Sequence, residues 1–209
     1  NAWANRYSAS TSAWGTATLI ETDDVGTATR PQVTVDPSGN AIAIWEQNDG
    51  TRFNIWANRY NASTSAWGTA TLVETNDVGD ATRPQVTMDP SGNAIAIWEQ
   101  SDGTRFNIWA SSLSASASAW GTATLIETDD AYFAFGAQIA MDASANAIPV
   151  WQQSDRTRRN IWANRYTPSA NWGTATSIET SDAGSAFGPQ VALDASGNAT
   201  AAWYQSDGM

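Results

Sequence analysis

The sequence predicts an all-β protein, a β-propeller built from four repeats of about 53 residues. Three observations predict this fold. Tryptophans recur at a constant spacing, each repeat contains four short segments rich in β-branched and aromatic residues with turn signals between them, and no segment keeps a helical period of apolar residues. Periods near 50 residues are typical of propellers and solenoids, in which each unit buries its faces only against its neighbours.

Tryptophan positions define the repeats. The twelve tryptophans form three series: Trp3, Trp56, Trp109 and Trp162; Trp14, Trp67, Trp120 and Trp172; and Trp45, Trp98, Trp151 and Trp203. Members of a series lie 53 residues apart, except for a one-residue deletion in the last repeat. We expect these tryptophans to pack between blades. Because the repeats fill the chain, we expect a single domain, residues 1–209.

Each repeat is expected to form one blade of four antiparallel strands. In one copy the inner, second, third and outer strands correspond to residues 83–89, 93–100, 107–113 and 120–127. These segments are rich in Ile, Val, Trp and Thr, which favour extended strands. The expected blades cover residues 30–74, 83–127 and 136–179, and a last blade combines residues 187–209 with residues 1–22.

The last blade carries a prediction about ring closure. The chain begins with a third strand and ends after a second strand, so the two half-blades are complementary. A blade shared in this way would close a four-bladed ring and hide its sheet edges. The alternative is half of an eight-bladed ring, completed by a second copy or by further sequence. Because the first residue is Asn1, we expect the chain to be a piece of a longer protein.

The inner and second strands are joined by the turn sequence DPSGN at residues 36–40. Its aspartate can accept backbone hydrogen bonds, Pro37 presets φ, and Gly39 supplies a left-handed residue. Asp-Gly signals in residues 48–51 and 101–104 predict the hairpins that follow the second strands. The aspartates that begin the turns are therefore interpreted as turn caps rather than as catalytic or metal-binding groups: Asp36, Asp89, Asp142 and Asp194.

The third repeat departs from the others in its second strand. Pro149 replaces an alanine, and a proline there removes one ladder hydrogen bond, so we expect a local bulge. Ala145 occupies the turn position that is glycine in the other repeats, where a left-handed residue is expected.

Composition excludes several classes of function. The formal net charge is −11, all ten basic residues are Arg, and Lys, His and Cys are absent. An acidic chain is repelled by nucleic acid and by anionic membranes, and no apolar run is long enough to cross a bilayer. No cofactor is expected. The one metal candidate is calcium, in the acidic loops that follow the outer strands: Asp23, Asp24, Asp77, Asp80, Asp129, Asp130 and Asp182.

Residues 59–67, RYNASTSAW, resemble the Asp-box turn of sialidase-like (BNR-type) propeller repeats in length and in the closing Trp67. Ala62 and Thr64 stand where the box has Asp and Gly, so the box is degenerate. The blade layout also resembles tachylectin-like bacterial lectin propellers, which implies sugar binding between blades. A sialidase would require an arginine triad, a Tyr nucleophile with a Glu partner, and an Asp acid/base.

The repeats argue against that enzyme chemistry. The arginines and tyrosines that match it recur at equivalent positions: Arg6, Arg59 and Arg165, and Tyr7, Tyr60 and Tyr166. An active site needs groups in differing environments, and near-identical units do not supply them. We therefore expect no catalytic residues and no enzymatic activity.

Ligand binding is expected on the face where inner strands begin and second strands end. The units differ there, because Arg and Glu in the first two give way to Phe with Gln or Tyr in the last two. The candidate ligand-binding residues are Arg30, Glu46, Arg83, Glu99, Phe135, Gln152, Phe187 and Tyr204. The arginine and glutamate of a unit could instead form a plain surface ion pair.

The sequence thus predicts a non-enzymatic, lectin-like module for glycans or cell-surface polymers, on an extracellular or cell-surface bacterial protein. The alternative is a structural or adhesive repeat with no small-molecule ligand. Either a monomer or a homodimer agrees with the repeat pattern.

Overall fold

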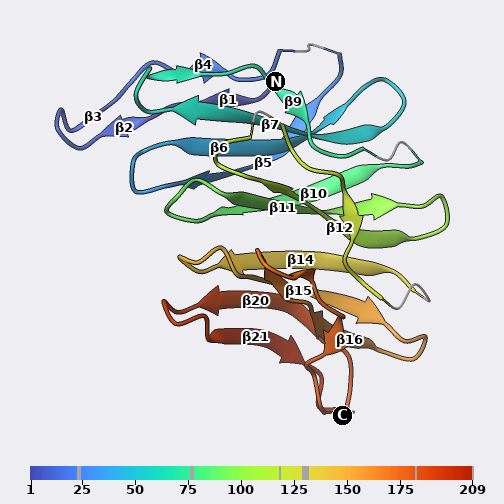
Figure 1. Cartoon of the computed structure of the whole chain (residues 1–209). Coiled ribbons are helices and arrows are strands. Elements are labelled where there is room, and N and C mark those ends of the chain that lie inside the picture. Colours follow the sequence, from blue (N-terminus) through green and yellow to red (C-terminus); the bar gives the residue numbers. More distant parts are fainter. Residues whose placement is uncertain (23–24, 76–77, 118, 129–131, 182, 209) are drawn as a thin grey trace.

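Antiparallel sheets follow one another in chain order in the computed structural model (Figure 1). The structure describes residues 1–22, 25–75, 78–117, 119–128, 132–181 and 183–208. Within these residues every regular element is a β-strand, which confirms the all-β prediction. The sheets form a row from the N-terminal half-blade to the C-terminal one, with three fuller blades between them (Figure 1).

The strands agree with the repeat pattern. The N-terminal half-blade contains β1 (Trp3–Ala4), β2 (Tyr7–Ser8), β3 (Ala13–Trp14) and β4 (Thr18–Leu19). The first full blade contains β5 (Ala28–Val35), β6 (Ala41–Asn48), β7 (Phe53–Asn61), β8 (Ala66–Trp67) and β9 (Thr71–Leu72). The second contains β10 (Ala81–Met88), β11 (Ala94–Ser101), β12 (Phe106–Leu113) and β13 (Thr124–Leu125).

The third blade is divided more finely. It contains β14 (Ala134–Met141), β15 (Ala147–Ser154), β16 (Arg159–Ala163), β17 (Tyr166–Thr167), β18 (Asn171–Trp172) and β19 (Thr176–Ser177). The C-terminal half-blade contains β20 (Ala186–Leu193) and β21 (Ala199–Gln205).

The outer strands are shorter than expected. Of the expected segment 120–127, only β13 pairs as a strand. Side chains of the third strand reach the outer segment in place of a longer backbone ladder. Asn58 Nδ2 donates to the carbonyl of Gly68 at 3.0 Å, and Ser111 Oγ donates to the carbonyl of Gly121 at 2.8 Å.

The expected closing blade is not formed within one chain. The pair β1–β4 and the pair β20–β21 are separate two-stranded sheets, and they lie at opposite ends of the row (Figure 1). The three full blades stand between the two half-blades, so neither half-blade reaches the other to share its strands (Figure 1). The expectation that residues 187–209 and 1–22 share one blade is therefore not met in this structure.

Apolar side chains pack between neighbouring blades. Ile42, Ile44 and Ile55 of the first blade form one buried cluster with Ala96 and Trp98 of the second. A similar cluster joins the second blade to the third. The tryptophans of the three central second strands are 0% exposed, which confirms the expected packing for Trp45, Trp98 and Trp151. Trp3 and Trp14 of the N-terminal half-blade are 59% and 67% exposed, so for these two the expectation is wrong.

A polar contact accompanies each of these tryptophans. The indole N–H of Trp98 donates to Gln100 Oε1 at 2.8 Å, and Gln100 Nε2 donates to Glu74 of the preceding blade at 3.4 Å. In the last repeat Gln205 Nε2 donates to Glu179 of the preceding blade at 2.9 Å. The indole N–H and the glutamine amide thereby gain hydrogen-bond partners at the blade boundary. This contact was not predicted from the sequence.

The turn aspartates are caps, as predicted. Asp36 Oδ1 accepts the backbone N–H of Asn40 at 2.9 Å, and its Oδ2 accepts the Asn40 side-chain amide at 2.7 Å. The same two bonds recur at Asp89, Asp142 and Asp194. Ala145 has φ of 61°, so the expected left-handed residue is confirmed there.

The hairpin aspartates between second and third strands are held in the same manner. Asp49 Oδ1 accepts the Thr51 hydroxyl at 2.6 Å and the backbone N–H of Arg52 at 3.0 Å. Asp102 and Asp155 make the equivalent bonds with Thr104 and Thr157. These hydrogen bonds hold the pKa of each hairpin aspartate well below its ordinary value, and the bond from the threonine hydroxyl has the largest effect.

Pro149 lies in the second strand of its blade, β15, but it interrupts the third strand and causes no bulge in β15. The pairing of β14 with β15 runs without a register shift through Ile139 and Pro149, so the bulge expected near Pro149 is absent. The carbonyl of Pro149 accepts the N–H of Asn164 at 3.2 Å, but proline has no N–H to return. The ladder breaks opposite this residue, and the third strand is split into β16 and β17.

We predict that β15 is the least protected of the three central second strands in amide hydrogen exchange. Ala96 occupies in β11 the position of Pro149, so Ala96→Pro should raise exchange in the second blade toward that of the third. Mass-spectrometric exchange would measure both. Equal protection of β6, β11 and β15 in the unmodified chain would contradict the prediction.

We also predict that acid destabilises the fold through the hairpin aspartates. Their pKa values are lower in the folded chain, so their contribution is complete above the ordinary pKa of about 4 and is lost as pH falls below it. Melting temperatures between pH 7 and pH 2 should fall more steeply for the unmodified chain than for the triple variant D49N, D102N and D155N. Parallel curves would refute the assignment.

Candidate functional site

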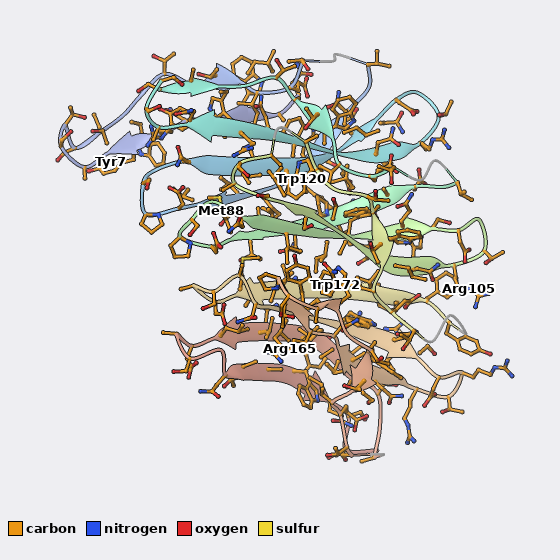
Figure 2. All side chains as sticks on the ribbon, viewed as in Figure 1. Tyr7, Met88, Arg105, Trp120, Arg165 and Trp172 are labelled. Atoms are coloured by element: carbon orange, nitrogen blue, oxygen red, sulfur yellow. The ribbon has the colours of Figure 1, made fainter. Side chains whose placement is uncertain are left out.

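A β-bulge marks the beginning of each inner strand. In β5 the register shifts between Thr29 and Gln32, and β10, β14 and β20 shift at equivalent positions. Each bulge contains a residue with positive φ: Arg30 at 49°, Arg83 at 51°, Gly136 at 68° and Gly188 at 59°. We call the side of the molecule that carries these bulges the bulge face. Figure 2 shows Arg105, on the hairpin at this face, on the opposite side from Met88, which ends β10.

The eight predicted residues lie on the bulge face, with Arg30 and Arg83 inside the bulges themselves. Across each bulge, the inner strand pairs with the end of the second strand. The opposing residues are Thr29 and Glu46, Thr82 and Glu99, Phe135 and Gln152, and Phe187 and Tyr204. The face therefore has a charged half, on the first two blades, and an aromatic half, on the last two repeats.

Glu46 is the best-satisfied carboxylate of the charged half. It is 1% exposed and accepts hydrogen bonds from Arg30 Nη1 at 2.5 Å and from the Thr29 hydroxyl at 2.6 Å. Its second oxygen accepts the backbone N–H of Arg83, in the next blade, at 2.8 Å. Glu46 thus fixes the bulge of the following blade.

Glu99 repeats the arrangement one blade later. It accepts Arg83 Nη1 at 2.6 Å and the backbone N–H of Gly136 at 2.7 Å. Burial raises the pKa of the Glu99 carboxyl, even though both of these donors favour the charged form. The side chains of Arg30 and Arg83 are about half exposed, at 52% and 54%, so each ion pair is buried only at its glutamate end.

The third blade also contacts the bulge of the next repeat, although an uncharged Gln152 replaces the glutamate there. Gln152 Oε1 accepts the backbone N–H of Gly188 at 3.3 Å. The glycines at these two bulges leave room for the side chains that end the second strands, Gln152 and the larger Tyr204. A β-carbon added at Gly188 would lie 2.9 Å from the Tyr204 ring, and one added at Gly136 would lie 3.2 Å from Gln152 Nε2. The change from Arg to Gly and the change at the end of the second strand are therefore coupled.

The aromatic half is a row of rings with an arginine in it. The guanidinium of Arg159 lies 4.7 Å from the Phe135 ring centroid and 5.1 Å from that of Phe187. Phe187 and Tyr204 are stacked, with centroids 5.4 Å apart and planes inclined by 19°. Tyr204 ends the row and is 67% exposed. We call these four residues the aromatic row.

Arg159 is the site residue that sequence reasoning missed. It begins β16, where the first two blades have Phe53 and Phe106 at the start of the third strand. The replacement of phenylalanine by arginine at this position was the signal that the sequence offered. Its meaning depended on the spatial arrangement, because Phe135 and Phe187 belong to different repeats and only stacking of the blades places both beside Arg159.

Residues that a sialidase would use are not gathered into one site. Arg6 and Arg59 lie on the opposite side from the bulge face, each against a different neighbour. Arg59 Nη1 donates to the carbonyl of Ala117 at 2.8 Å, whereas Arg6 donates to the Tyr60 hydroxyl and covers its ring. A groove of about 550 Å³ between the first two blades, lined in part by Tyr60 and Trp67, opens on that side.

Of the acidic loop residues named for calcium, Asp80 lies within the described residues, and its Oδ1 accepts the N–H of Phe53 at 2.9 Å. The other acidic loop residues named above, Asp23, Asp24, Asp77, Asp129, Asp130 and Asp182, lie outside the described residues. Within the described part of the chain, no three acidic side chains come together in a way that could hold a metal ion.

Comparison with known proteins identifies a fold and no family. No family model matches the sequence, and no curated protein does. A solved protein of unknown function from Dyadobacter fermentans matches with a TM-score of 0.64 and 10% identity, over 91% of this chain and 56% of that one. A Hadza microbial sialidase matches with a TM-score of 0.57 and 14% identity, over 80% of this chain and 40% of that one.

An endo-arabinase from Bacteroides thetaiotaomicron matches with a TM-score of 0.50 and 13% identity, over 92% of this chain and 77% of that one. The chain thus spans about half the length of the first two structures. At these identities the likeness concerns the fold, and it confirms the sialidase-like propeller architecture. The Asp-box assignment itself gains no support from it.

We predict that the ion pairs of the charged half stabilise the fold. Arg83→Ala keeps the β-carbon at the bulge but leaves the buried Glu99 without its cation, which should lower the free energy of unfolding by about 1–3 kcal/mol. The control is Arg105→Ala, which removes a pair with Asp102, whose side chain is 33% exposed where that of Glu99 is 1% exposed, and it should cost less than about 1 kcal/mol. Urea denaturation measures both. Equal costs would contradict a special role for the Glu99 pair.

Proposed function

We propose that this chain is a carbohydrate-binding module that recognises glycans through the aromatic row on its bulge face. The observation that carries the proposal is the stacked pair of Phe187 and Tyr204, whose outer ring is 67% exposed. An exposed ring held flat by a second ring offers an apolar face against which a sugar ring can stack. It is held in place before any ligand arrives, so little conformational entropy is lost on binding.

Polar groups beside the rings supply the specificity that stacking lacks. Arg159 lies between Phe135 and Phe187, which fixes its planar guanidinium while leaving donors at its edge. Gln152 pairs across the strand with Phe135, and its amide can serve as a further polar group for sugar hydroxyls. An apolar platform with a few placed donors is the usual composition of a small-molecule site.

We propose binding without hydrolysis. A glycosidase uses two carboxyl groups, one to protonate the leaving oxygen and one to attack or to activate water. Glu46 and Glu99 are the buried glutamates of the predicted site, and each accepts hydrogen bonds from an arginine and from a backbone N–H of the next blade. Carboxylates that already accept these hydrogen bonds serve to hold neighbouring blades together. Hydrolysis of the sugars that bind would overturn this part of the proposal.

The solved structures that share the fold include a sialidase and an endo-arabinase, and this supports carbohydrate as the ligand class. We further propose that the module acts outside the cell or at its surface, where glycan polymers are found. In the described residues no helix could span a bilayer.

We predict that Tyr204→Ala and Phe187→Ala each weaken binding at least tenfold, which corresponds to a loss of about 1.4 kcal/mol. A glycan array of xylo-, arabino- and sialyl-oligosaccharides selects a binder, and calorimetry with that oligosaccharide then measures the affinities. The control is Trp14→Ala, because Trp14 is equally exposed, at 67%, but lies far along the chain in the N-terminal half-blade. Arg30→Ala tests the charged half and should leave the affinity within about twofold.

Two results would refute the proposal. Affinity that survives both aromatic substitutions would remove the bulge face as the binding site. A lack of saturable binding across the array would leave the second class of function, a structural or adhesive repeat.

A further inference from the structure

The hairpin between the second and third strands is more basic in the third blade than in the first two. In the first two blades it contains one Asp and one Arg, within residues 48–53 and 101–106. Residues 154–159 of the third blade contain one Asp and three Arg, a formal charge of +2 in a chain whose net charge is −11. We call these residues the arginine hairpin. One of its arginines is common to all three hairpins, and the two additions are Arg156 and Arg159.

Arg156 adopts a backbone conformation that arginine rarely takes. Its φ is 89°, close to the values of 97° and 93° at the equivalent Gly50 and Gly103. A β-carbon added at either glycine would have no other atom within 4 Å, so the tip of the hairpin needs no side chain for packing. Glycine builds the same hairpin without strain, and strained residues concentrate at ligand-binding sites. The arginine therefore indicates a function other than folding.

Both added arginines lie over aromatic rings. The guanidinium of Arg156 is 5.1 Å from the ring centroid of Tyr132, and that of Arg159 lies between Phe135 and Phe187. Tyr132 and Phe135 belong to one segment, which leads into β14. A guanidinium that stacks on a ring keeps its N–H donors at the edge of the stack, where a second partner can accept them. The arginine hairpin thus presents two oriented donor groups beside the aromatic row.

Neutral groups stand here where the first two blades have carboxylates. Gln152 replaces the buried glutamate at the end of the second strand. In the first blade, the N–H of Phe53 at the start of the third strand donates to the Asp80 carboxylate at 2.9 Å. In the third blade, the N–H of Arg159 donates to the Ser185 hydroxyl at 3.1 Å. These changes leave the region more positive, which favours an anionic partner.

We propose that the aromatic row and Arg156 together form a site for acidic saccharides. A carboxylate or sulfate group of the glycan accepts hydrogen bonds from Arg156 and Arg159, and a neighbouring sugar ring stacks on Tyr204. Both anions present pairs of oxygen atoms that match the donors of a guanidinium. The inference rests on the proposed function, which supplies the stacking surface.

The charge of the whole chain limits the kind of anion. A chain with a net charge of −11 repels long polyanions, so the acidic group must be carried singly and act within the screening length of about 8 Å. The site also differs from one built on the repeated arginines, because Arg6 and Arg59 lie on the side opposite the bulge face and contact neighbouring blades.

Matched saccharides that differ only in charge test the inference. The carboxylate arm compares a xylo-oligosaccharide bearing one glucuronic acid with the same molecule after that carboxyl has been reduced to an alcohol. The sulfate arm compares a monosulfated galacto-oligosaccharide with its desulfated form. Calorimetry should give at least about tenfold tighter binding of the acidic member in one arm or both, because charge-assisted hydrogen bonds are stronger than neutral ones.

Two variants restore the residues of the first two hairpins. Arg156→Gly should weaken binding of the acidic member at least about fivefold without lowering the melting temperature, because glycine relieves the positive φ. Arg159→Phe should reduce the preference for the acidic member as well. The matched control is Arg105→Ala, which also removes one positive charge from a hairpin of the bulge face and should leave this affinity within about twofold.

The outcomes separate this inference from the proposed function. Equal binding of the charged and neutral members in both arms would overturn the inference and leave the proposed function standing. An acid preference that survives both Arg156→Gly and Arg159→Phe, or that falls equally in Arg105→Ala, would also overturn it. Equal affinity for a short glutamate peptide would refute a saccharide as the partner. Binding of no saccharide in either arm would contradict both proposals.

Discussion

Contact between neighbouring blades is the constraint on which the structure depends. A blade of four short strands has two faces and no interior of its own, so its apolar side chains are buried only when another blade covers them. Ile44 and Trp98 show the arrangement, since they belong to successive blades and share one buried cluster. The Trp–Gln–Glu contact satisfies the polar groups at the same boundary.

Contact between neighbouring blades also shapes the bulge face. Glu46 and Glu99 reach from the end of one second strand to the bulge of the next blade, where a backbone N–H turns toward them. When the third repeat replaces the glutamate with Gln152, the contact persists without charge. That freedom allows the last two repeats to carry aromatic rings where the first two carry ion pairs. The architecture is thus conserved across the boundary while the surface chemistry changes.

Local rules predicted much of the fold. Tryptophan spacing and Asp-Gly turns are signals that act over a few residues, and they located the strands, the aspartate caps and the left-handed Ala145. Phe135 with Gln152 and Phe187 with Tyr204 were also matched correctly, because antiparallel pairing across a known turn is a local property, and Arg30 and Arg83 form the expected ion pairs with Glu46 and Glu99. Their role in binding stays a prediction.

Features that depend on several blades were not predictable in this way. Arg159 acquires its two ring contacts only because stacking places Phe135 and Phe187 on either side of it. Closure depends on how all the blades stack, which no single repeat encodes, and so the shared blade was expected where the structure has two separate half-blades. Pro149 was judged correctly as a lost donor, but the break fell on the partner strand that needed that donor.

A double-mutant cycle across one blade boundary tests the central claim most directly. The free energies of unfolding of Ile44→Ala, Trp98→Phe and the double variant would be measured by urea denaturation. If contact between blades holds the fold, the two substitutions are coupled, and their effects depart from additivity by about 0.5–3 kcal/mol. Additive effects within about 0.3 kcal/mol would mean that each blade is stable without its neighbour, and would contradict the account.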